Sequence, residues 1–220
     1  MKKFTIIKII ASAMLLLIGT GLLAADDYFP LKKNYKWNYD VIIGEDKTVE
    51  NFEIRKLGKK KVVPQKITIG DVVYFDYLLD TKKGLVLYAR QSSTDLEPVI
   101  LDTLVYLCKK PFKAGTTWKS DITSTLLMEN VSVPLTYEIQ KSKETITVQA
   151  GTFEKCLKVI GKGWVERDKG LLGTIKLEVV HTNWFAPDVG FIKSHLHTSG
   201  NHMLVKDTDT YTQLTKFSRK

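Results

Sequence analysis

The histidines are the residues whose type and spacing most clearly suggest chemistry. His195 and His197 are two positions apart, so on an extended strand their side chains point to the same face. His202 follows after a Ser-Gly-Asn turn, and His181 lies in the preceding stretch. Imidazole nitrogens that converge on one point bind zinc, which makes these four the candidate metal ligands. Because no carboxylate completes a familiar zinc motif, we favour a polar, solvent-facing strand and assign no metal or other cofactor.

Sequence signatures of catalysis are missing. The chain has no Gly-x-Ser-x-Gly elbow, no His-Glu-x-x-His motif and no phosphate-binding glycine loop. Ser194 and His195 are adjacent, so on a strand they face opposite ways and cannot act as nucleophile and base. We therefore predict that the protein is not an enzyme. A metal-dependent hydrolase that uses His195, His197 and one of His181 or His202 is kept as an alternative.

Aromatic residues are the second group of interest, with 4 Trp, 9 Tyr and 9 Phe in the chain. Aromatic rings dominate the cores of β-proteins, and core packing is the simpler explanation. The same rings can line an apolar cavity inside a curved sheet, where a lipid or another hydrophobic ligand would bind. The residues predicted to line such a ligand-binding cavity are Trp37, Tyr39, Trp118 and Trp184.

Lysines cluster near several predicted turns. Arg55, Lys56 and Lys59–Lys61 flank one predicted hairpin, and the pairs Lys82-Lys83 and Lys109-Lys110 lie near two others. If these turns share one end of the sheet, they form a basic rim able to meet anionic lipid headgroups. Lysine-rich turns also keep a protein soluble and prevent edge-to-edge pairing. The formal net charge is +9, and the lysines alternate with acids, which argues against nucleic acid as a partner.

Two cysteines occur, Cys108 and Cys156. An oxidising compartment outside the cytoplasm would allow one disulfide between them. A free cysteine, however, also behaves as a small buried hydrophobe. The sequence leaves both alternatives open.

Strands are the elements predicted to position these residues. Apolar and polar residues alternate over short runs, which is the pattern typical of a β-strand. Examples are the segments 35–43, 71–79, 144–149 and 173–180, which are rich in Val, Ile, Thr and Tyr. Short segments of turn-forming residues, each only a few residues long, separate such runs, which predicts antiparallel hairpins. Residues 94–108 fit both a helix and a strand, and Pro98 lies early enough to be compatible with a helix start. The sequence leaves this segment ambiguous, and we favour extended structure.

The stretch WFAPDVGFIKS at 184–194 is predicted to be a turn between two strands. Pro187 and Asp188 suit its two central positions, and Gly190 can adopt a positive φ. The segments PLKKNYKW at 30–37 and PFKAGTTW at 111–118 form a weak internal echo. Each reads as a loop that enters a strand beginning with a buried tryptophan.

Residues 1–25 have the layout of a secretory signal peptide: two lysines, an apolar run and a Leu-Leu-Ala-Ala end. The apolar core at 11–18 is short for a membrane-spanning helix, so we predict cleavage and no transmembrane span afterwards; an uncleaved anchor is the alternative. Residues 26–220 are long enough for a single domain. We predict a mainly β domain of antiparallel strands, a strongly curved sheet or half-barrel, in the periplasm or secreted.

Three stretches resemble a group of exported bacterial proteins of uncharacterised function. They are YFPLKKNYKW at 28–37, VQAGTFEKCLKV at 148–159 and WFAPDVGFIKS at 184–194. The group is similar to the curved antiparallel sheets of periplasmic lipoprotein carriers, which implies the same fold class here. Asn34 stands where the group usually has glycine, and Cys108 falls outside its motifs. The resemblance implies no catalytic residue.

Together these features predict an exported, non-enzymatic protein that binds a hydrophobic or envelope-derived ligand in the concave face of its sheet. The alternative is a structural or protein-interaction module that docks another envelope protein.

Overall fold

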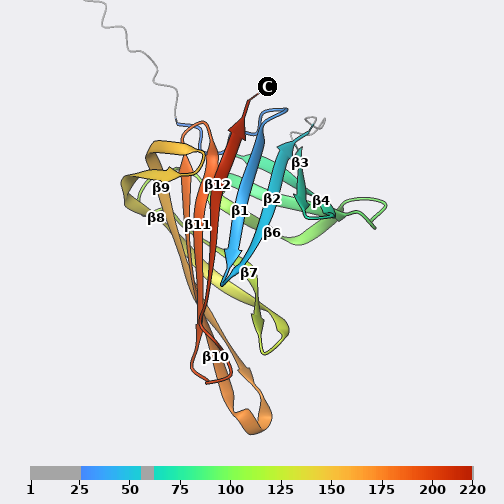
Figure 1. Ribbon diagram of the computed structural model, residues 1–220, viewed down its shortest axis with the longest axis vertical. Helices are drawn as coiled ribbons and strands as arrows, with labels where there is room; N and C mark the ends of the chain where they lie inside the picture. The colour runs from blue at the N-terminus through green and yellow to red at the C-terminus, as the bar shows by residue number, and fades with distance from the viewer. Residues whose placement is uncertain (1–25, 56–61, 220) are drawn as a thin grey trace, which may run out of the picture.

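The computed structural model describes residues 26–55 and 62–219, and almost all of this chain is extended (Figure 1). The predicted signal peptide at 1–25 lies outside the described residues, as do Lys56 and Lys59–Lys61. Within the described part, no helix is long and apolar enough to span a membrane. The elements there are β1 (Lys36–Ile43), β2 (Asp46–Ile54), β3 (Val62–Ile69), β4 (Val72–Thr81), β5 (Gly84–Ser92), β6 (Val99–Lys109), β7 (Thr117–Leu126), β8 (Glu129–Val148), β9 (Gly151–Asp168), a 3-10 turn (Gly170–Leu172), β10 (Thr174–Ala186), β11 (Gly190–Gly200) and β12 (Thr208–Ser218).

The strands form one antiparallel sheet that nearly closes into a barrel. Its order is β6-β5-β4-β3-β2-β1-β12-β11-β10-β9-β8-β7, so neighbours in sequence pair, and β1 also pairs with β12. The two edge strands, β6 and β7, approach each other where the indole Nε1 of Trp118 donates a hydrogen bond to the Tyr106 carbonyl at 3.1 Å. The prediction of a single, mainly β domain with a strongly curved antiparallel sheet is confirmed.

The pleat of the strands builds the barrel interior. In β8, Val131, Val133, Leu135, Tyr137 and Ile139 are buried, while the residues between them are exposed. Inward-facing residues of β7, β9 and β10 pack against this row and form one hydrophobic cluster. The first half of β8 therefore divides between core and surface at alternate residues.

A second buried cluster includes Trp37 and Tyr39 of β1 together with Val148 and Cys156 of the β8–β9 hairpin. The pairing of β8 with β9 shifts register after Ile139. Beyond this irregularity the hairpin tip lies against β12, where the Ala150 amide donates to the Leu214 carbonyl at 3.1 Å. The tip thus gains packing that two paired strands alone would lack.

The N-terminal segment, residues 26–35, lies across one end of the barrel. Tyr28 is 1% exposed, and its hydroxyl donates to the Lys155 carbonyl at 3.0 Å. The ring of Phe29 packs against Phe185 with centroids 4.8 Å apart. Asn34 adopts a positive φ of 68°, a conformation that asparagine tolerates better than most residues and glycine best.

The local predictions for ambiguous segments are confirmed. Residues 99–109 are a strand, and Pro98 directly precedes it. At the β10–β11 turn the Val189 amide donates to the Ala186 carbonyl at 3.3 Å, which makes Pro187 and Asp188 the central pair. Gly190 has a φ of 94°. The two echo segments also behave as predicted, because each leads into a strand with a buried tryptophan, Trp37 in β1 and Trp118 in β7.

Candidate functional site

The barrel encloses a cavity of about 380 Å³. This volume lies at the lower end of the range for small-molecule sites, 300–1,000 Å³. The wall is largely aliphatic and aromatic, with contributions from nearly every part of the sheet. Among the apolar lining residues are Phe52, Ile67, Leu78, Val105, Ile122 and Phe185.

Two of the four aromatics predicted to line a cavity do so, Trp37 and Tyr39 of β1. The Trp37 indole Nε1 donates to the Val189 carbonyl at 2.7 Å, and the Tyr39 hydroxyl donates to the Phe191 carbonyl at 2.9 Å. Burial raises the pKa of Tyr39 well above its usual value, so this hydroxyl stays protonated. Because their polar atoms are satisfied by backbone, both rings offer the cavity an apolar surface.

The other two predicted lining residues, Trp118 and Trp184, are not part of the cavity wall. Trp118 is opposite Tyr137 in the β7–β8 pair and stacks on its ring, with ring centroids 5.3 Å apart and planes 11° apart. Trp184 faces the other side of the sheet, because successive residues of β10 alternate and its neighbour Asn183 points inward. There its indole donates to Glu144 Oε2 at 2.8 Å.

The main polar feature of the wall is a pair of residues that meet across a glycine. Tyr137 of β8 is opposite Gly161 of β9, and Gly161 is opposite His181 of β10. A Cβ on Gly161 would lie 2.4 Å from the Tyr137 ring. The missing side chain lets the ring lie over β9, and its hydroxyl reaches His181 Nδ1 at 3.0 Å. Burial lowers the pKa of His181 to about 4.

Further polar residues border the cavity, among them Asp76, Asp121 and Asn183. Asp76 is 8% exposed, and both of its carboxylate oxygens accept hydrogen bonds from Arg90, at 2.7 and 3.0 Å. Asp121 accepts a hydrogen bond from the Ser132 hydroxyl at 2.9 Å. Asn183 is also 8% exposed and lines the wall beside His181, where its amide can form hydrogen bonds with an occupant of the cavity.

The exposed lining residues belong to the two edge strands. Of the cavity's described lining residues, only Leu107 of β6 and Asp121 of β7 are exposed. At another part of the wall, Phe29 of the N-terminal segment is itself a lining residue.

The four histidines considered as candidate metal ligands separate into different environments. His195 and His197 share the outer face of β11, where His195 Nε2 and His197 Nδ1 lie 2.7 and 2.9 Å from the same oxygen of Asp209. His181 is inside the barrel, on the opposite face. His202 is in the β11–β12 connection and accepts a hydrogen bond from the Leu204 amide. Among the described residues, no group of three or more His, Cys, Asp or Glu is arranged to hold a metal ion.

Both cysteines are buried free thiols. Cys108 belongs to the interior cluster and Cys156 to the second cluster, so the two are not bonded to each other. Burial raises the pKa of Cys108 to about 12 and also raises the pKa of Cys156. Of the two alternatives left by the sequence, a disulfide and free cysteines that pack as small hydrophobic residues, the structure has the second.

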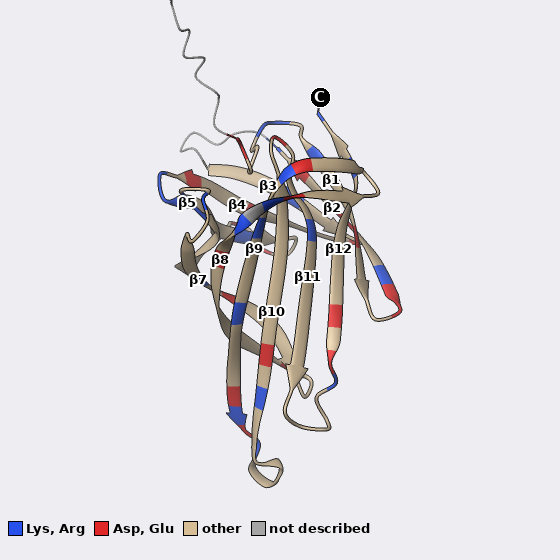
Figure 2. Ribbon diagram, turned by 90° about the vertical axis from the view of Figure 1, so that its left-hand side faces the viewer, with Lys and Arg blue, Asp and Glu red and all other residues tan. Residues whose placement is uncertain are grey.

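The described parts of the lysine-rich segments lie at one end of the barrel, which is the condition for a basic rim. Because all strands are antiparallel, the last residues of β2, β4 and β6 lie at the end that also holds the C-terminus (Figures 1 and 2). Its described connections carry Lys32, Lys33, Arg55, Lys82, Lys83, Lys110, Lys113 and Arg219 against Asp26, Asp27 and Asp188. The opposite end carries Glu45, Asp71, Asp95, Glu97 and Asp207 against Lys169 and Lys206. We call the first of these the basic end.

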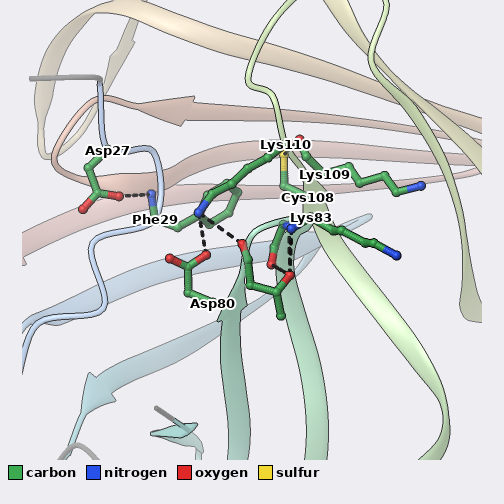
Figure 3. Close-up of polar contacts among 9 residues, drawn as sticks. Asp27, Phe29, Asp80, Lys83, Cys108, Lys109 and Lys110 are labelled. Atoms are coloured by element: carbon green, nitrogen blue, oxygen red, sulfur yellow. Dashed lines mark hydrogen bonds and ion pairs between the residues drawn. The ribbon is translucent and has the colours of Figure 1, made fainter.

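Local contacts at the basic end hold two of its turns together. The Lys110 amide donates to the Lys83 carbonyl at 2.9 Å, and Lys110 Nζ forms an ion pair with Asp80 at 2.7 Å (Figure 3). Lys83 and Lys109 extend away from this ion pair in Figure 3. Lys109 Nζ lies over the Tyr106 ring, 5.4 Å from its centroid.

Sequence reasoning missed Tyr137, Gly161 and Asn183. The alternation in β8 and β10 could have placed Tyr137 and Asn183 on inner faces. An isolated glycine inside a strand was a signal of close approach at Gly161. Their meeting with His181 depends on the register of three strands, which no single segment encodes.

No protein-family model matches the chain. No curated protein matches it in sequence. Among solved structures, the fold is similar to that of a "putative lipoprotein" from Parabacteroides distasonis, with a TM-score of 0.43 and 15% sequence identity over 88% of this chain and 99% of the other. At this TM-score and identity, the likeness has no bearing on ligand or location.

Proposed function

We propose that this is an exported, non-enzymatic binding protein that holds one small hydrophobic or amphiphilic ligand inside its barrel. The observation that carries the proposal is the cavity of about 380 Å³, walled mainly by apolar side chains and bordered by a few polar groups. This combination is typical of ligand sites. Export rests on the signal-peptide layout of residues 1–25.

The energetics favour an apolar ligand portion in this cavity. Each methylene group that leaves water for such a wall contributes about 0.8 kcal/mol. Trp37 and Tyr39 already have their polar atoms bonded to backbone, so they lose no hydrogen bond when a ligand covers them. Every strand of the wall except the edge strands β6 and β7 pairs with a neighbour on each side. The wall is therefore largely rigid, and binding costs little conformational entropy of the protein.

Cavity filling tests the proposal. Ile122 lines the cavity, whereas its neighbour Thr123 is exposed on the outer face of β7. We expect Ile122→Trp to weaken the binding of N-phenyl-1-naphthylamine, a fluorescent apolar probe, by roughly 10-fold or more, and Thr123→Trp to leave it unchanged. Native mass spectrometry of protein purified from its own envelope should reveal a bound apolar compound. Absence of probe binding to the wild type would contradict the proposal.

The basic end supports an orientation toward an anionic membrane surface. Each lysine or arginine near such a surface contributes about 1 kcal/mol. We expect the protein to float with vesicles that contain phosphatidylglycerol more than with purely zwitterionic vesicles, and less so at high salt. Lys83→Glu with Lys109→Glu should abolish this difference, whereas Lys169→Glu with Lys206→Glu, at the opposite end, should not.

A second candidate function is that of a protein-interaction module, which the exposed edge strand β6 favours. Val99, Ile100 and Leu104 are 58%, 59% and 54% exposed there. An edge strand with apolar side chains is a template for pairing with another chain. If docking at this edge is the function, Leu104→Lys should abolish a cross-linked complex in the envelope while probe binding is retained.

A further inference from the structure

The polar corner of the cavity is built from side chains on adjacent strands. The hydroxyl of Tyr137 meets His181 Nδ1 at 3.0 Å, and Asn183 lies two residues from His181 on the same inner face of β10. Trp118, opposite Tyr137 in the β7–β8 pair, stacks on the Tyr137 ring and restricts its orientation. Gly161 provides the space that lets Tyr137 reach the next strand. Buried polar groups that are positioned in this way specify how a ligand is oriented.

This corner can form hydrogen bonds and carries no charge at neutral pH. Burial raises the pKa of Tyr137 and lowers the pKa of His181 to about 4, so both are neutral there. If the Tyr137 hydroxyl donates to Nδ1, the proton of the neutral imidazole is on Nε2, which then becomes a donor. The Asn183 amide adds two donor hydrogens and one acceptor oxygen.

The charged groups that border the cavity are unsuited to an anion. Among the described lining residues there is no lysine or arginine. The acidic ones are Asp76, which is already paired with Arg90, and Asp121, which accepts from Ser132. A carboxylate or phosphate drawn into this wall would lose its hydration without gaining a cation, which is costly. The cations of the protein gather instead at the basic end, outside the cavity.

We propose that the cavity selects an amphiphile with an uncharged, hydrogen-bonding head group, such as an alcohol, ester or amide, and that Tyr137, His181 and Asn183 hold this head. The proposal rests on the proposed function, because it specifies the ligand of the same cavity. Its apolar portion lies against Trp37, Tyr39 and Ile122. Ligands of the fatty-acid type, with an ionised head, are predicted to bind poorly.

Two probes of equal chain length test this selection. We would measure displacement of N-phenyl-1-naphthylamine by 1-dodecanol and by dodecanoate at pH 8, where the acid is ionised. We expect the alcohol to bind at least roughly 10-fold more tightly, because the hydrogen bonds are available to both heads but only the carboxylate must leave a charge unpaired. Equal or tighter binding of dodecanoate would overturn the selection and leave the proposed function intact. Failure of the wild type to bind the naphthylamine at all would instead contradict the proposed function.

Variants of the polar corner test which residues hold the head. Asn183→Leu and His181→Phe, made separately, should each lower the ratio of the 1-dodecanol affinity to the naphthylamine affinity by roughly 3- to 10-fold. The control is His195→Phe on the outer face, which should change neither the 1-dodecanol affinity nor the naphthylamine affinity. Tyr137→Phe is a conservative third variant that removes the hydroxyl and keeps the stacked ring. Circular dichroism establishes that each variant is folded. An alcohol preference that survives all three inner variants would overturn the assignment of these residues.

Discussion

The inner and outer faces of the β10–β11 pair carry similar residue types in different chemical situations. On the inner face, His181 and Asn183 border a cavity, and His181 is held neutral by burial. On the outer face, His195 and His197 share one oxygen of Asp209 in partial contact with solvent. The outer groups bond to one another, whereas the inner ones keep bonding capacity for a ligand. The pleat of a strand, more than residue type, therefore decides which polar side chains are available for recognition.

The inner and outer faces of the whole sheet should differ most in what their tryptophans, Trp37 of β1 and Trp184 of β10, contribute to stability. Trp37→Ala removes a ring that is 5% exposed and leaves the Val189 carbonyl without its indole partner, so we expect a loss of about 3–5 kcal/mol in the free energy of unfolding. Trp184→Ala, on the half-buried outer face, should cost about 1–2 kcal/mol. Urea denaturation measures both. Equal losses would show that the inner face is not the better packed of the two.

The histidines should differ in how they couple stability to pH. The pKa of His181 falls from 6.5, its ordinary value, to about 4 in the folded protein. Its contribution is fully present above pH 6.5, and as the pH falls toward 4 the unfolded chain takes up the proton first, so about 3 kcal/mol is lost. His181→Gln should flatten the decline between pH 7 and pH 4 relative to the wild type.

The control for this titration is His195→Gln on the outer face. It should follow the wild-type curve between pH 7 and pH 4 more closely than His181→Gln does, because the carboxylates other than Asp209, which His195 contacts, are common to all three proteins and cancel in the comparison. A His181→Gln curve parallel to that of the wild type would mean that His181 is not held neutral by burial.

The glycine between Tyr137 and His181 offers a smaller, more local change on the inner face. A methyl group at Gly161 would lie 2.4 Å from the Tyr137 ring, so Gly161→Ala should displace the ring and cost about 1–3 kcal/mol. Most of this loss should disappear when Tyr137 is already replaced by Leu. A double-mutant cycle by urea denaturation measures the coupling, and additive losses would contradict the close approach.

The sequence predicted the fold better than it predicted the site. Alternation and short turns were enough for the antiparallel sheet, and Pro187-Asp188 was enough for the β10–β11 turn. They also put His195 and His197 on one face. Alternation and turn residues could not show that Trp118 stacks on Tyr137, because this contact follows from the pairing of β7 with β8. Sites that are assembled across strands depend on register, and register is a property of the whole sheet.

The smallest expected effect is on the outer face, at Asp209. Hydrogen bonds from His195 and then from His197 lower the pKa of this carboxyl. Replacing both histidines with Gln should raise the pKa of Asp209 toward 3.8, its ordinary value, as measured by a carboxyl-carbon NMR titration. Binding of the naphthylamine probe should not change, because the sheet separates this cluster from the cavity. A loss of probe binding would show instead that the two faces are coupled through β11.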